Sequence, residues 1–149
     1  MIGGIRRIIA FGAVAASLSL GCRTGPSFEG KWSGERAIQG QPGADPAVLK
    51  TLSKLEIEFR SDGRFQMTDA GMGKSGSYRY GDLAGKPAAF LRVDSILGRP
   101  LSEQPESVQR SHEKEAEAVL QPDGTLAYHD PAGFDRETIF LHRASQPGP

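Results

Sequence analysis

The chain has 149 residues with 18 basic and 18 acidic side chains, so its formal net charge is zero and it lacks the strong positive field that attracts nucleic acid. Its length suits one domain rather than several. It contains one cysteine, which excludes an internal disulfide. The domain must therefore be held together by apolar packing and hydrogen bonding.

The N-terminal region contains an apolar run of thirteen residues, 8–20, directly after Arg6 and Arg7. A membrane-spanning helix needs about 20 apolar residues, whereas the apolar part of a secretory signal needs about 7–15 behind a basic start. The run therefore predicts a signal peptide over residues 1–21. An uncleaved N-terminal anchor is the alternative.

The segment Leu18-Ser19-Leu20-Gly21-Cys22 resembles the lipobox of bacterial lipoproteins, although that family prefers leucine at the position of Ser19. The resemblance implies that Cys22 is the lipid attachment site, carrying a diacylglyceryl group and, on its freed amine, a further acyl chain such as palmitate. Two or three chains would hold the protein on a membrane, because one chain alone anchors only marginally. An ordinary signal peptide with an incidental cysteine is the alternative.

The lipobox resemblance also implies a location in the cell envelope. Residues 22–27 would form a lipidated tether, and Arg23 stands where an aspartate would retain the protein at the inner membrane, which favours the outer membrane, facing the periplasm. Removing residues 1–21 from the 149 leaves 128, with 16 basic and 18 acidic side chains, hence a net charge of −2. We expect a membrane partner through the acyl chains and no nucleic-acid partner.

A short helix and a β-hairpin are the clearest elements after the tether. Asp45 is a helix N-cap followed by a proline in the first turn, which predicts a helix over 45–52. In the segment 55–68, Leu55, Ile57 and Phe59 share one face, and the turn that follows contains an Asp-Gly pair. This pattern predicts a hairpin with one buried face.

Similar alternation continues to the C-terminus. Residues 95–113 look like a long solvated loop with a helical turn near 106–115, and residues 144–149 are expected to be a disordered tail. The remaining strands are predicted at 31–38, 75–80, 88–94, 116–120, 125–128 and 136–143. The fold class is therefore an all-β antiparallel meander of about eight strands, closed or half-open as a barrel, since closure removes unpaired edges.

The segment Gly30-Lys31-Trp32, with Phe28 before it and a basic residue on the last strand, resembles the lipocalin superfamily over residues 28–143. In that family the tryptophan plugs the closed end of the barrel and an arginine packs over its ring. The matching positions are Trp32 and Arg143, with Arg136 as a second candidate. The resemblance implies a lipocalin-like β domain and a barrel that could hold a small apolar ligand.

Two interpretations of the barrel interior remain open. Small residues on the strands 88–94 and 116–120 could leave room for a ligand, or they could accommodate aromatic side chains from the opposite wall. Arg36 shares a face with Trp32, so it could pair with a ligand carboxylate, as in related fatty-acid carriers, or point into water. The candidate ligand-binding residues are Trp32, Arg36, Tyr78, Tyr80, Leu91, Ala118, Leu126 and Phe140.

No catalytic or cofactor-binding pattern emerges, and we expect neither an enzyme nor a metal or cofactor. Gly73-Lys74-Ser75 ends like a phosphate loop but lacks the earlier glycine, and we interpret it as a hairpin turn. The three histidines lack zinc-site spacing. Two functions remain: an envelope lipoprotein that binds a small apolar ligand in its barrel, or an envelope interaction or assembly module with a solid core and an unknown protein partner.

Overall fold

The computed structural model describes residues 27–38, 43–133 and 137–144. The predicted signal peptide, Cys22, Arg136 and residues 145–149 of the predicted C-terminal tail lie outside the described residues.

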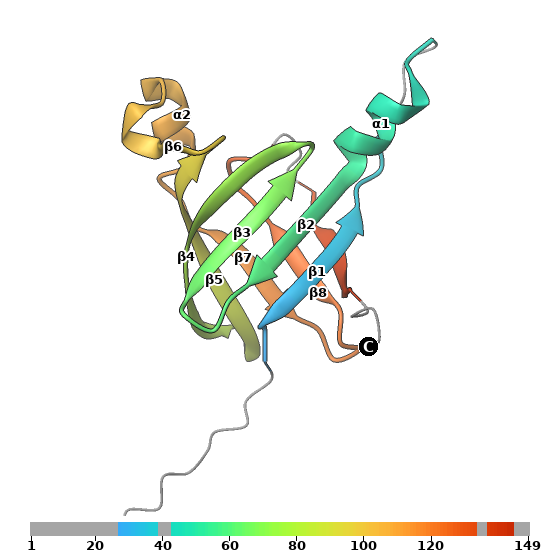
Figure 1. The fold of residues 1–149 in the computed structure, drawn as a ribbon. Coiled ribbons are helices and arrows are strands. Elements are labelled where there is room, and N and C mark those ends of the chain that lie inside the picture. Colours follow the sequence, from blue (N-terminus) through green and yellow to red (C-terminus); the bar gives the residue numbers. More distant parts are fainter. Residues whose placement is uncertain (1–26, 39–42, 134–136, 145–149) are drawn as a thin grey trace, which may run out of the picture.

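Within the described part of the chain, eight antiparallel strands close into a barrel (Figure 1). Each strand pairs with its neighbours along the chain, and the first and last strands pair with each other through Trp32–Arg143 and Ser33–His142. The predicted all-β meander is therefore confirmed, in its closed form. The strands are β1 (Gly30–Glu35), β2 (Lys54–Phe59), β3 (Arg64–Asp69), β4 (Met72–Leu83), β5 (Lys86–Ile96), β7 (Ala116–Leu120), β8 (Leu126–His129) and β9 (Ile139–Arg143).

The connection between β5 and β7 contains more structure than the predicted loop. A two-residue strand, β6 (Arg99–Pro100), pairs with β5 outside the closed barrel, and the helices η1 (Leu101–Glu103) and α2 (Glu106–Ser111) follow. The predicted helix is α1 (Pro46–Ser53), and its N-cap Asp45 accepts a hydrogen bond from the Ala47 amide at 2.8 Å. No helix in the described residues is long and apolar enough to cross a membrane.

The two ends of the barrel differ in what they carry. The chain enters at Ser27 and leaves at Ala144 at one end, which we call the tether end; the Ala144 amide donates to the Lys31 carbonyl there at 2.8 Å. The opposite end, the far end, carries α1 and α2 (Figure 1).

Three hairpin connections contain two residues each, and both residues have positive φ: Ala70-Gly71, Ala84-Gly85 and Leu97-Gly98. This is the pattern of a type I′ turn, in which asparagine, aspartate or glycine is normally favoured at the first position. Alanine or leucine there is strained, because a side chain disfavours the left-handed region. Leu97, with φ of 50°, is the bulkiest of the three and is 69 % exposed.

The first of these turns corrects one prediction. Gly73-Lys74-Ser75 is not a hairpin turn but part of β4, which begins at Met72 directly after the turn at Ala70-Gly71. The prediction failed because Ala-Gly is a poor turn signal, whereas a Gly-Lys-Ser segment resembles a loop. Lys74 therefore lies on a strand and points into the barrel, where its side chain is 4 % exposed.

Candidate functional site

The barrel interior is apolar from the tether end to its middle. Of the predicted ligand-binding residues, Trp32, Leu91, Ala118 and Leu126 lie there, with at most 2 % of their surface exposed. Ala89 pairs with Ala118 in the β5–β7 register, and both are fully buried. These small side chains belong to one buried cluster with larger ones: Phe28, Leu55, Ile57, Phe59, Phe65, Met67, Tyr128 and Leu141.

The tether end is closed by Trp32 and Arg143. The Arg143 guanidinium carbon lies 4.7 Å from the centre of the Trp32 ring, a cation–π geometry. Arg143 also donates to the carbonyl oxygens of Glu29 at 2.7 Å and Ser27 at 2.6 Å, while the Trp32 indole donates to the Phe28 carbonyl at 2.8 Å. The segment that leads into β1 is therefore fixed to the closed end.

Two predicted interior residues lie elsewhere. Phe140 was predicted to line the interior, but it is 57 % exposed, because Ile139 and Leu141 on either side of it in β9 are the ones that point inward. Tyr80 shares the inward face of β4 with Tyr78 but lies at the tether end, and it is 54 % exposed.

The two tyrosines form a small aromatic group with Phe28. The Tyr80 ring lies 5.5 Å from the ring of Phe28, and its hydroxyl lies 3.2 Å from that of Tyr78. The Tyr78 hydroxyl donates to the Arg60 carbonyl at 2.6 Å. Burial, followed by the contact with Tyr80, raises the pKa of Tyr78 above its usual value of 10.0.

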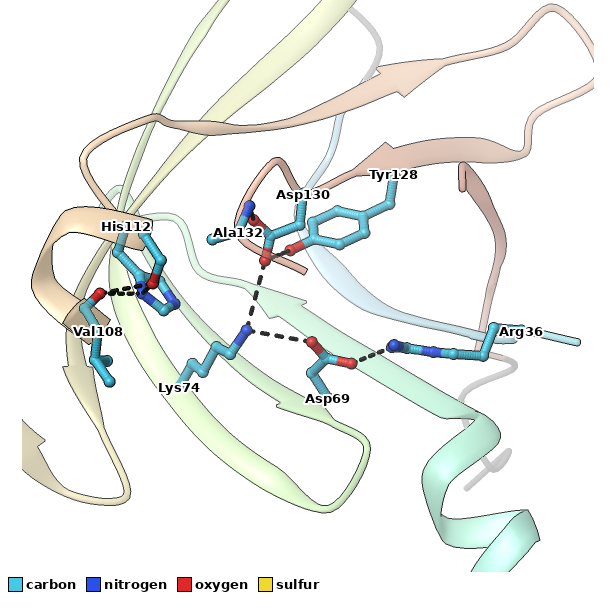
Figure 2. Close-up of polar contacts among 9 residues, drawn as sticks. Arg36, Asp69, Lys74, Val108, His112, Tyr128, Asp130 and Ala132 are labelled. Atoms are coloured by element: carbon cyan, nitrogen blue, oxygen red, sulfur yellow. Dashed lines mark hydrogen bonds and ion pairs between the residues drawn. The ribbon is translucent and has the colours of Figure 1, made fainter. Parts of the chain in front are cut away.

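At the far end, the interior holds a cluster of four buried charges, which we call the charge cluster: Arg36, Asp69, Lys74 and Asp130 (Figure 2). Lys74 Nζ donates to Asp69 Oδ2 at 3.2 Å and lies 3.5 Å from Asp130 Oδ2. Arg36 donates to the other oxygen of Asp69. Two cations thus balance two carboxylates, on segments from four different parts of the barrel wall.

Tyr128 completes the charge cluster. Its hydroxyl donates to Asp130 Oδ2 at 3.3 Å, and the other Asp130 oxygen accepts from the Ala132 amide at 2.8 Å. Burial raises the pKa of Tyr128 well above 10.0, and the nearby Asp130 carboxylate adds to the effect. The phenol therefore remains a neutral donor at any ordinary pH.

The cluster answers one open question from the sequence and adds residues that were not predicted. Arg36 points inward, as one interpretation allowed, but its observed partner is Asp69. Asp69, Lys74 and Asp130 were missed, although each continues an inward-facing alternation: Asp69 follows Met67, and Asp130 follows Tyr128. A polar residue on the buried face of a strand was the available signal.

His112 lies at the same end of the barrel, directly after α2 (Figure 2). Its Nδ1 is 2.9 Å from the Val108 carbonyl oxygen, so the proton is placed on Nδ1. Its Nε2 is buried and has no hydrogen-bond partner in the described residues. The described residues contain no group of three or more side chains that could hold a metal ion.

Comparison of the chain with protein-family models, with curated protein sequences and with solved structures finds no match.

Proposed function

We propose that this protein is an exported, lipid-anchored protein of the bacterial cell envelope that acts through its outer surface, as a protein–protein interaction or assembly module. The filled interior carries this proposal. A cavity with room for a small ligand would leave accessible surface on the side chains around it. Leu55, Ala89, Ala118, Leu126 and Leu141 have none.

The position of the tether supports the anchoring part of the proposal. Ser27 is fixed to the tether end by Arg143. Cys22 is five residues earlier, which an extended chain spans in at most about 18 Å. Acyl chains on Cys22 would hold the tether end against the membrane and turn the far end toward the periplasm.

The anchor is tested by metabolic labelling with an alkyne fatty acid in the native host. The parent protein should incorporate the label and the Cys22→Ala variant should not, since the thiol is the attachment point. Ser19→Leu restores the leucine that the lipobox prefers and should raise the labelled fraction. Equal labelling of the parent and Cys22→Ala would refute the anchor.

The filled interior is tested with a fluorescent fatty-acid probe and with mass spectrometry under native conditions. We expect the protein purified from its native host to contain no bound small molecule. We also expect it not to bind the fluorescent probe. Leu126→Ala is the matched control, because removing a fully buried leucine side chain opens a cavity in the same interior. Stoichiometric probe binding by the unaltered protein would overturn the proposal.

One observation favours a second candidate, an amphipathic small ligand held at the far end. Buried ion pairs contribute little net stability and often mark functional sites. Val93 and Ile139, 7 % exposed each, are among the more accessible core residues. A ligand carboxylate could take the place of Asp130 beside Lys74. This second candidate would be established by a carboxylate lipid that copurifies with the parent and with Arg79→Met but not with Lys74→Met. Absence of such a lipid from the parent would eliminate the candidate.

A further inference from the structure

The strand β4 continues beyond its neighbour β3 at the tether end of the barrel. Its pairing with β3 ends at Ser77, whereas β4 itself runs on to Leu83, where a two-residue turn leads into β5. Within the described part of the chain, residues 79–83 therefore pair with β5 on one side and with no strand on the other. We call this side of residues 79–83 the open edge.

The main chain of the open edge has donors and acceptors that face outward from the sheet. In an antiparallel hairpin, successive residues bond alternately to the two sides. The residues flanking the two-residue turn bond to each other, so Gly81 also bonds to β5, while Tyr80 and Asp82 face the open edge. The Tyr78 amide has the same direction and donates to the Gly63 carbonyl at 2.8 Å. The described residues provide no such partner for Tyr80 and Asp82.

The opposite flank of the same hairpin is protected against pairing. Pro87 has no N–H group to offer there, and the Lys86 ammonium donates to the Gln121 side chain at 2.8 Å across that flank. Proline and lysine are among the residues that keep a strand edge from pairing with another chain. The two flanks of one hairpin therefore differ in whether a further strand can be added.

The charged side chains of the open edge do not block it. The Arg79 guanidinium donates to Glu115 at 2.7 Å, which lies on the far side of β5, directly before β7. The Asp82 carboxylate accepts from the Gly85 amide in the turn at 2.8 Å. Both charges are thus directed away from the open edge, and its main-chain groups are available to pair with another strand.

Aromatic rings lie on both faces of the sheet beside the open edge. On the inner face Tyr80 is exposed. On the outer face the Phe90 ring lies over Gly81, because a Cβ atom on this glycine would be 2.8 Å from Phe90 Cε2. Aromatic side chains pair favourably with apolar and β-branched side chains on a neighbouring strand. A strand added here would therefore find apolar contacts as well as hydrogen bonds.

We propose that the open edge binds an extended polypeptide segment of another protein, which adds a strand to β4. Only an extended main chain repeats its donors and acceptors with the spacing that a strand edge presents, so the edge specifies the chemistry of its partner. A segment of about five residues covers positions 79–83. This inference rests on the proposed interaction function and specifies its surface.

The anchor disfavours a second copy of the chain as the partner. Two copies joined by a twofold axis through the same edge would pair antiparallel, so their tether ends would point in opposite directions. Because Cys22 lies five residues before Ser27, the two lipid anchors could not then reach one membrane. A different envelope protein with an extended segment near the membrane surface has no such restriction.

The test uses the full-length protein in its native host, with the photo-crosslinking residue p-azidophenylalanine in place of Tyr80, which keeps an aromatic ring at the open edge. The control carries it in place of Phe140 on the outer face of β9, which is exposed to the same degree, 57 % against 54 % for Tyr80. Mass spectrometry then identifies the crosslinked peptide. We expect a discrete protein partner from position 80 and none from position 140.

Three variants separate main-chain pairing from side-chain contact. Asp82→Pro removes an N–H group that faces the partner and leaves the bonds to β5 in place, so it should reduce the crosslink about tenfold or more. Asp82→Ala loses the same carboxylate but keeps the N–H group, and it should retain the crosslink. Pro87→Ala supplies an N–H group on the opposite flank and should also retain it. Thermal unfolding establishes that each variant is folded.

Hydrogen exchange gives a measurement that needs no substitution. A synthetic peptide with the crosslinked sequence should slow exchange of the Tyr80 and Asp82 amides about tenfold or more, because the partner strand would accept hydrogen bonds from them. The Gly81 amide already bonds to β5, so its exchange should slow less. Unchanged exchange at Tyr80 and Asp82 would overturn strand addition, even where Asp82→Pro fails to fold.

The outcomes separate this inference from the proposed function. A partner captured from position 140 but not from 80 would overturn the open edge and leave the interaction function standing, as would a crosslink that Asp82→Pro does not weaken. Crosslinks only to lipid or to a second copy of the chain would overturn the stated partner. The absence of a protein crosslink at both positions would overturn the open edge and count against the interaction function itself.

Discussion

The charge cluster makes a quantitative prediction for Lys74→Met, which keeps an unbranched side chain one atom shorter and removes its charge. Lys74 Nζ is 3.2 Å and 3.5 Å from its two carboxylate oxygens. At an effective dielectric constant of about 20, each contact is worth about 5 kcal/mol of Coulomb attraction, most of it offset by desolvation. Removing one partner leaves the other buried charges unbalanced. We expect the free energy of unfolding to fall by about 3–5 kcal/mol.

Restoring neutrality should recover part of that loss. In Lys74→Met combined with Asp130→Asn, the Arg36–Asp69 pair remains, and the side-chain carbonyl introduced at position 130 can still accept from the Ala132 amide. We expect the double variant to be about 1–2 kcal/mol less stable than the parent, and therefore more stable than Lys74→Met alone.

The assay is urea unfolding at neutral pH, followed by the fluorescence of Trp32. This tryptophan is buried at the tether end, away from the substitutions, so its signal reports on unfolding of the whole barrel. A loss below about 1 kcal/mol for Lys74→Met would show that the lysine is hydrated rather than buried. Additive losses in the double variant would refute the idea that charge imbalance is the cause.

Three further predictions concern other parts of the barrel. Arg143→Ala should lower the free energy of unfolding by about 1–2 kcal/mol and shift the emission of Trp32, because two hydrogen bonds and the cation–π contact are lost; unchanged emission would contradict the plug. Gly76→Ala should cost about 3 kcal/mol or more, since its methyl group would lie 1.9 Å from the Arg92 carbonyl oxygen; circular dichroism and thermal unfolding measure this, and a stable variant would show that the two strands can separate. The pKa of Tyr128 is raised in the folded chain, so its contribution to stability is complete below pH 10 and is lost as the pH rises from there toward the folded-state value. Urea unfolding across that range should show the parent losing about 1.4 kcal/mol per pH unit more than Tyr128→Phe, and parallel slopes would refute this.

Local patterns in the sequence were sufficient for much of the fold. The alternation of Leu55, Ile57 and Phe59 places one face of β2 in the core, and Asp45 starts α1 where an N-cap was expected. Both signals act over a few residues and need no tertiary information. The number of strands predicted a barrel but left open whether it closes, and the pairing of β1 with β9 supplies the closure.

The errors came from features that depend on distant parts of the chain. Phe140 was assigned to the interior, whereas the pairing of β9 with β8 and β1 decides which face of the strand is buried. Arg36 and Asp69 are 33 residues apart in sequence, so their pairing is visible only once the barrel closes. Leu97 gave no turn signal because leucine is rare where φ is positive.

Entry and exit of the chain at the same end constrain how the protein can be labelled. Ser27 and Ala144 both leave beside the Trp32 plug, with the Ala144 amide bonded to the Lys31 carbonyl. If Cys22 is acylated, a fluorescent protein fused after residue 149 would be crowded against the bilayer. It would also tilt the barrel on its short tether. An epitope inserted before α1 would instead project away from the lipid surface, where an antibody can reach it.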